Sequence, residues 1–218
     1  MNRREISLFS GADMMKSAGI LIGFLPLILY GILSGPTTQS VEIALVVSLA
    51  ASIVTGLSDL RNGFLIAWIN LVFFLIALVL IVFFGLTSLI PFLWVLLYAT
   101  FTVMTFASIL VRSPFTLQYA RKMVEPELWG NPVFIRVNDF MTGVWGCLFG
   151  INFVLSVISL NNPALQAPLQ LTTYSVLIGG VAFSVLFPGY IRKKRSGRIA
   201  GPDGSIGPED QPGPSEDL

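Results

Sequence analysis

The residue best suited to chemistry inside an apolar stretch of this chain is Asp139. Ionisable side chains in such stretches are costly and are often functional. Glycines follow Asp139 at i+4, i+7 and i+11, namely Gly143, Gly146 and Gly150. All four residues therefore share one narrow face of a helix, and the last two glycines form a small-xxx-small pattern typical of close helix contacts.

Two interpretations of Asp139 follow from its position. In the first, Asp139 pairs with Arg136 or Arg112, and the glycine face is a site of tight helix packing. In the second, Asp139 forms the floor of a cavity that opens to the cytoplasm and binds a cation or a proton. A second pair of glycines with the same spacing, Gly19 and Gly23, predicts another close helix contact.

The segment from residue 112 to residue 126 is also rich in polar side chains. Ser113 predicts the N-cap of a helix, Pro114 its first residue, and Pro126 its end. The apolar side chains of this helix fall on one face, so we expect it to lie in the membrane interface. It is either a structural elbow or a ledge that binds phosphate or carboxylate groups. The ledge would be built from Arg112, Arg121, Lys122 and Arg136.

The composition and the apolar runs of the chain indicate which helices carry these residues. The chain has 218 residues, of which 54% are hydrophobic and only 11% charged, against roughly 25% charged in soluble domains. Six apolar runs are long enough to cross a bilayer. They are about 17–34, 40–57, 64–85, 88–111, 133–160 and 169–191. The sequence thus predicts an all-α integral membrane protein with six transmembrane helices in three hairpins.

The positions of the cations predict the orientation. Of the 13 Lys and Arg residues, 12 lie before the first run, after the last, or in the connections after the second and fourth runs. The remaining one, Arg136, lies at the start of the fifth run, beside the connection after the fourth. The other three connections, 35–39, 86–87 and 161–168, contain none. The positive-inside rule therefore places both termini in the cytoplasm, in a multi-pass protein of the plasma (inner) membrane. The first run is expected to be an uncleaved anchor, because no small-x-small cleavage site follows it.

The charge balance separates two regions. Residues 1–195, the predicted transmembrane domain, carry 12 basic and 7 acidic residues. Residues 196–218 carry 1 basic and 5 acidic residues and are rich in glycine and proline. Such a segment has too few apolar side chains to form a core, so we expect a disordered cytoplasmic tail.

Several classes of function are not indicated. The chain has no histidine and a single cysteine, Cys147, which lies within a span and is expected to be buried. No phosphate-binding loop, dinucleotide-binding pattern or metalloprotease motif is present. We therefore expect no enzyme activity, catalytic residue, metal or cofactor, and no nucleic-acid partner.

Other polar residues have structural interpretations. Asn70 and Asn152 are expected to donate hydrogen bonds between helices. The segment 59–63 (Asp-Leu-Arg-Asn-Gly) predicts a short cytoplasmic turn closed by Asn62 and Gly63. A structural role in that turn is enough to explain Asp59 and Arg61.

The turn at 59–64 (Asp-Leu-Arg-Asn-Gly-Phe) and the step at 112–115 (Arg-Ser-Pro-Phe) resemble the bacterial intracellular septation protein A-type inner-membrane proteins. The stretch from Ser113 through Gly146 is also similar to uncharacterised six-span bacterial membrane proteins. The resemblance covers spans 2 to 5, roughly half of the chain, and the acidic tail departs from it. It implies a role in the cell envelope and no catalytic residues.

We therefore expect a non-enzymatic protein that acts through partners. These are the lipid bilayer, with anionic headgroups as candidates, and a second copy of the chain or another membrane protein. The alternative is a small transporter or channel with a cytoplasmic vestibule near Asp139. Transporters often contain repeats and broken helices, and the sequence shows no three-span repeat.

Overall fold

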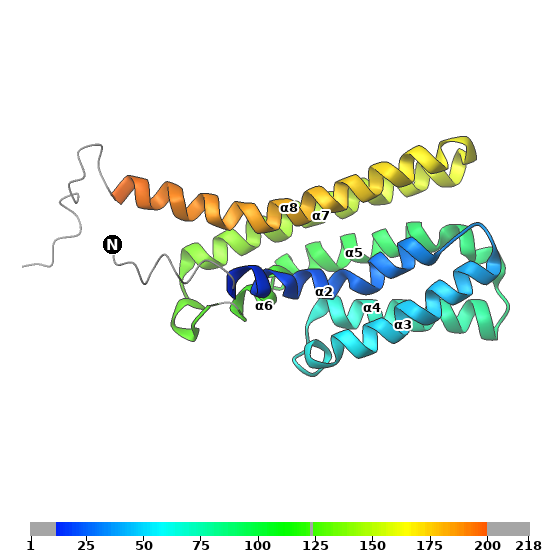
Figure 1. The fold of residues 1–218 in the computed structure, drawn as a ribbon, viewed down its shortest axis with the longest axis horizontal. Coiled ribbons are helices and arrows are strands. Elements are labelled where there is room, and N and C mark those ends of the chain that lie inside the picture. Colours follow the sequence, from blue (N-terminus) through cyan, green and yellow to red (C-terminus); the bar gives the residue numbers. More distant parts are fainter. Residues whose placement is uncertain (1–11, 123, 200–218) are drawn as a thin grey trace, which may run out of the picture. The chain divides into compact units, whose positions relative to one another are not determined.

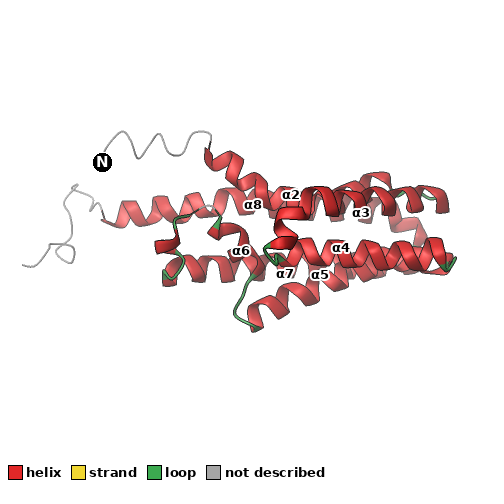
Figure 2. Cartoon of the chain, turned by 90° about the horizontal axis from the view of Figure 1, so that it is seen from below, coloured by secondary structure: helices red, strands yellow, loops and turns green. Residues whose placement is uncertain are grey.

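The structure is a computed structural model that describes residues 12–122 and 124–199, with side chains for 22–122 and 124–187. Its regular secondary structure in these residues is all helical: helices are joined by loops, and there is no strand (Figure 2). The predicted tail at 200–218 lies outside the described residues. The chain divides into two compact units, residues 1–180 and 181–218. The packing described below concerns the first unit.

Eight α- and π-helical elements and several short 3-10 turns follow one another (Figure 1). The longer α-helices are α2 (Ala12–Leu33), α3 (Thr38–Arg61), α4 (Leu65–Leu78), α5 (Leu93–Leu110), α7 (Pro132–Asn161) and α8 (Gln166–Ile199). The shorter elements are the π-helix η1 (Val79–Phe83), α6 (Phe115–Arg121) and the 3-10 helices η2 (Thr87–Phe92), η3 (Pro126–Leu128) and η4 (Pro163–Leu165).

Five segments of the described chain are long and apolar enough to cross a membrane. They are Thr38–Arg61, Leu65–Phe83, Thr87–Leu110, Pro132–Asn161 and Pro163–Phe187. Each matches one of the five later predicted runs. The apolar part of α2 with described side chains, Ile22–Leu33, is a shorter apolar helix. A multi-pass helical membrane protein is therefore supported, and the sixth span remains a prediction.

Helix ends follow the local sequence. Asn131 caps α7 by accepting hydrogen bonds from the backbone of Val133 and Phe134 at 2.9 and 3.4 Å, and Pro132 follows at the first position, as predicted. At the end of α3, Gly63 adopts φ +71°. Its N–H donates to Leu60, and the next N–H donates to Asp59. This is a Schellman ending, and the predicted Asn-Gly turn is confirmed.

The core of the first unit is largely aromatic. α5 packs on α7, α2 packs on α3, and α3 packs on α4. Phe24 stacks on Trp145 with ring centroids 4.9 Å apart, and Phe101 contacts Phe149 at 5.0 Å. The Tyr174 hydroxyl of α8 donates to the backbone oxygen of Gly31 in α2 at 2.7 Å. Apolar side chains such as Val54 and Leu110 remain largely exposed, as expected of a surface that meets lipid.

The second unit is described through residues 181–199, which continue α8. Within it, the rings of Phe183 and Phe187 stack one turn apart at 4.7 Å. The helix passes the predicted boundary at residue 195 and extends to Ile199.

Candidate functional site

The five residues proposed for the ledge and the vestibule differ in exposure and in their partners. Asp139 is half-buried on α7, and Arg112 and Arg136 are exposed. Asp139 forms no ion pair with either arginine, because the one ion pair among the described side chains joins Lys122 to Asp59. The salt bridge from Asp139 to Arg136 or Arg112, which the close-packing interpretation predicted, is therefore not present among the described side chains.

Arg112 ends α5 in a left-handed conformation with φ +56°, the one non-glycine residue with positive φ in the described chain. Its N–H donates to Ile109 at 2.9 Å, and the N–H of Ser113 donates to Ser108 at 2.9 Å. This is the same Schellman ending that Gly63 gives to α3, built here without glycine. The first role of Arg112 is thus to turn the backbone, at a cost in conformational strain.

The helix after Arg112 differs from the prediction in three respects. It spans seven residues, Phe115–Arg121, and does not reach residue 125. Its N-cap is Pro114, not Ser113, and no side chain caps it. The side chains of Phe115, Leu117 and Tyr119 are buried by protein. α6 therefore does not lie on the membrane interface with its apolar face in lipid, because that face is covered by the helices around it.

Polar contacts fix α6 against α7. The buried Thr116 hydroxyl donates to the backbone oxygen of Asn138 at 2.8 Å and lies 2.6 Å from the Thr142 hydroxyl. The backbone N–H of Phe115 donates to the Ser108 hydroxyl at 3.3 Å. These contacts hold the N-terminal half of α6 between α5 and α7.

The other end of α6 contacts the turn between α3 and α4. Gln118 accepts a hydrogen bond from the backbone N–H of Leu65 at 3.0 Å, which satisfies a free donor at the start of α4. Phe64 packs edge-on against Tyr119, with ring centroids 5.0 Å apart. Lys122 lies over the Phe64 ring at 4.3 Å. We call this group of contacts the α3–α6 junction.

Asp59 completes the α3–α6 junction and was missed as a site residue. Its carboxylate accepts a hydrogen bond from the Lys122 ammonium at 2.5 Å. The Asp59 side chain is 12% exposed and that of Lys122 is 42% exposed, so the ion pair reaches from the interior to the surface. A signal was present in the sequence. Asp59 lies two residues after the apolar run 40–57, at helical spacing from Ser52 and Thr55.

Tyr119 lies beside this ion pair. Burial raises the pKa of its hydroxyl above the ordinary value, and the negative charge of Asp59 raises it further. The same hydroxyl is close to α2, since a Cβ built on Gly23 would lie 2.9 Å from it. Gly23 thus makes the close contact expected of it, but with α6. Gly19 lies in α2, and its surroundings are outside the described side chains.

The remaining candidate cation is held by an aromatic ring. The Arg121 guanidinium lies 5.5 Å from the centre of the Trp129 ring, and the indole N–H of Trp129 donates to the Arg121 backbone at 3.2 Å. The contact is of the cation–π kind. Of the four ledge cations, Lys122 and Arg121 therefore have partners within the chain, whereas Arg112 and Arg136 have no ion-pair partner among the described residues.

The glycines of α7 do not form a uniform contact face. A Cβ on Gly146 would lie 3.0 Å from Phe106 and 3.1 Å from Thr105, so this glycine allows α5 to approach. A Cβ on Gly150 would lie 4.0 Å from Thr102 of α5, and one on Gly143 would meet nothing within 4 Å. Cys147, expected to be buried, is exposed. The tight packing predicted for this glycine face therefore occurs at Gly146, and Gly143 takes no part in it.

The two asparagines expected to donate hydrogen bonds between helices, Asn70 and Asn152, differ in their contacts. Asn70 donates from Nδ2 to the backbone oxygen of Gly23 at 2.8 Å, which confirms a hydrogen bond between helices. Asn152 is completely buried, and neither its Nδ2 nor its Oδ1 has a hydrogen-bond partner in the described chain. Its predicted donor role is therefore wrong.

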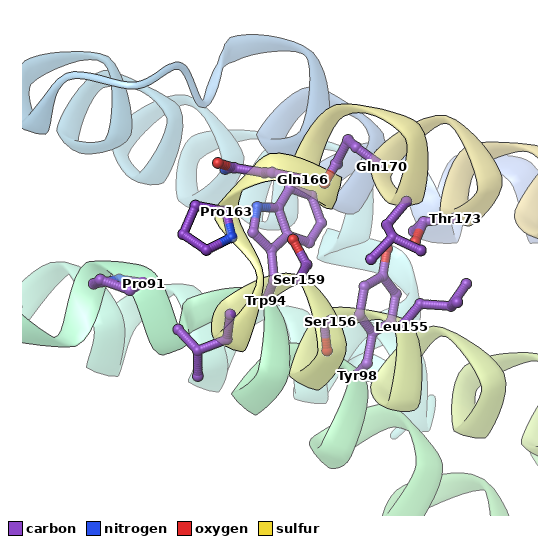
Figure 3. A pocket seen from close by; sticks show the side chains of 12 residues that line it. Pro91, Trp94, Tyr98, Leu155, Ser156, Ser159, Pro163, Gln166, Gln170 and Thr173 are labelled. Atoms are coloured by element: carbon purple, nitrogen blue, oxygen red, sulfur yellow. The ribbon is translucent and has the colours of Figure 1, made fainter.

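Two cavities are described, and neither is lined by Asp139. The larger, about 210 Å³, lies between α5, α7 and α8 (Figure 3). It has no charged side chain, and the buried hydroxyl of Tyr98 at its wall has no partner. Its polar and aromatic lining consists of Trp94, Tyr98, Ser156, Ser159, Gln166, Gln170 and Thr173. The smaller cavity, about 10 Å³, lies beside Asp59.

The described side chains include no group of three or more His, Cys, Asp or Glu residues placed to hold a metal ion. The chain matches no family model, no curated protein and no solved structure. The resemblance to septation protein A-type proteins therefore stays a prediction.

Proposed function

We propose that this chain is a six-span integral protein of the plasma (inner) membrane that acts by binding protein or lipid partners, not by catalysis. Both termini would lie in the cytoplasm. Five apolar helices support a multi-pass protein, and the distribution of cations supports the orientation.

The proposal rests mainly on the exposure of Arg112 and Arg136 and on their lack of an ion pair within the described residues. Both are exposed, and neither has an ion-pair partner among the described residues. They flank α6, at the end of the bundle that the cations assign to the cytoplasm. Arginine recognises phosphate and carboxylate groups through several N–H donors at once. Anionic lipid headgroups are therefore the first partner to test.

The test compares lipids and variants in the purified full-length chain. Anionic phosphatidylglycerol should raise the melting temperature in mixed micelles more than neutral phosphatidylcholine, because it binds the folded state. The double variant Arg112→Gln/Arg136→Gln should lose most of this difference. Arg61→Gln is the matched control, since Arg61 is also exposed and lies on the same predicted side. Equal losses in both variants, or equal effects of the two lipids, would contradict a specific ledge.

The topology is tested separately. A reporter fused in the 161–168 connection should respond as periplasmic, and one fused in the turn at 62–63 as cytoplasmic. The transporter alternative requires a cavity that reaches Asp139. The two cavities described above are lined by other residues.

A further inference from the structure

A small cavity with four polar side chains in its lining lies next to Asp59 between α2, α3 and α4. Its volume is about 10 Å³, close to that of a single water-sized sphere. One wall is a face of α3, where Ser52, Thr55, Gly56 and Asp59 follow each other at helical spacing. The other walls are Ile22, Gly23, Pro26, Ala67 and Asn70.

The side chains of this wall present oxygen lone pairs. The Ser52 hydroxyl donates its hydrogen to the backbone oxygen of Ser48 at 2.8 Å, and the Thr55 hydroxyl donates to Ala51 at 2.7 Å. Each hydroxyl has one hydrogen, so both oxygens can act only as acceptors toward the cavity. The wall of α3 therefore offers two hydroxyl oxygens and one carboxylate.

Asn70 adds a further acceptor that lacks a partner. Its side chain is 1% exposed, and its Nδ2 donates to Gly23. Its Oδ1 is buried and has no hydrogen-bond partner among the described residues. Leaving a buried carbonyl oxygen unpaired costs about 1–3 kcal/mol, so an occupant that binds this oxygen would stabilise the fold.

Pro26 leaves one backbone oxygen of α2 without its usual donor. Proline has no N–H, so the carbonyl of Ile22, four residues earlier, lacks its usual helical donor. Ile22 and Pro26 both line the cavity. Backbone carbonyls of unwound helices bind alkali cations in membrane transporters. α2 stays helical through Pro26, so here the missing N–H alone leaves the Ile22 oxygen without its donor.

We propose that this cavity binds one small monovalent cation of the size of Na⁺. The side chains of Ser52, Thr55, Asn70 and Asp59 present oxygen acceptors at the cavity, and the Asn70 Oδ1 has no other partner among the described residues. A cation can bind several acceptors at once, whereas a water molecule donates only two hydrogens. A single carboxylate, already paired on Oδ1 with Lys122, provides too little negative charge for a divalent ion, which usually recruits several carboxylates. The proposal goes beyond partner binding and does not depend on it.

The experiment measures the melting temperature of the purified full-length chain in micelles. Choline chloride is replaced by NaCl, LiCl or KCl at constant ionic strength. Na⁺ should raise the melting temperature along a saturable curve, more than K⁺ does, because it binds only the folded state. Equal melting temperatures in NaCl and choline chloride would show that water fills the cavity and would overturn the proposal.

A pair of threonine variants localises the effect. Thr55→Val should move the midpoint of the Na⁺ titration upward by about tenfold. Thr102→Val is the matched control, because Thr102 is also half-buried and donates to its own helix at 2.7 Å, but it does not line the cavity. Its midpoint should stay within about twofold of the wild type. Equal shifts in both variants would overturn the assignment, and Ser52→Ala provides the same comparison if Thr55→Val does not fold.

Discussion

Lys122 and Asp59 form an ion pair that joins the end of α6 to the last turn of α3, across 63 positions of sequence. Together with the contact of Gln118 with Leu65, it holds α6 over the turn between α3 and α4. The connection between α5 and α7 is therefore fixed from both sides, since Thr116 binds it to α7. A segment expected to rest on the membrane is instead part of the folded bundle.

Removing the lysine tests the strength of this connection. Lys122→Met should lower the free energy of unfolding by about 1–3 kcal/mol, because it leaves a largely buried carboxylate without its donor. The double variant Asp59→Asn/Lys122→Met should recover part of the loss, since no unpaired charge remains. Arg61→Met, at an exposed arginine in the same turn, should change stability by less than about 0.5 kcal/mol. Additive losses in the double variant would show that the pair contributes no coupling energy.

Arg112 provides a test of backbone strain. Arg112→Gly should stabilise the fold by about 0.5–1 kcal/mol, because glycine adopts φ +56° without a Cβ penalty. Arg112→Ala removes the same charge but keeps the Cβ, so it should give no such gain. The measurement is the unfolding midpoint of both variants in mixed micelles. If alanine stabilises as much as glycine, the gain comes from loss of charge and not from relief of strain.

These residues also show where sequence reasoning succeeded and where it stopped. The later apolar runs and the Asn131–Pro132 cap could be predicted, because hydropathy and capping depend on neighbours along the chain. The burial of α6 could not, because an apolar helix face looks the same whether lipid or protein covers it. The pairing of Asp59 with Lys122 depends on packing between distant helices. The left-handed end of α5 could not be predicted either, because the residue that usually marks such an ending is glycine, and here it is Arg112.

The glycines of α7 give a matched pair of substitutions. Gly143→Ala should stabilise the helix by about 0.5–1 kcal/mol, because its Cβ would enter open space. Gly146→Ala places a Cβ 3.0 Å from Phe106, so the contact between α5 and α7 must widen. Its unfolding free energy should fall below that of Gly143→Ala by about 1–3 kcal/mol. Equal values for the two variants would mean that α5 does not approach α7 at Gly146.

The raised pKa of Tyr119 predicts how stability changes at alkaline pH. In the unfolded chain a tyrosine ionises near pH 10. In the folded chain, burial and the Asp59 carboxylate keep the Tyr119 hydroxyl protonated to higher pH. Above about pH 10 the folded state therefore binds more protons than the unfolded state, and stability falls as pH rises. Below that pH the contribution of Tyr119 is fully present.

Tyr119→Phe isolates this contribution, because phenylalanine keeps the ring that packs on Phe64 and removes the ionisable group. The measurement is the free energy of unfolding in mixed micelles between about pH 8 and pH 11, a window chosen around the ordinary pKa of tyrosine. The wild type should lose stability more steeply above about pH 10 than the variant does. Parallel curves would show that the Tyr119 hydroxyl titrates equally in the folded and unfolded chains, and that Asp59 does not act on it.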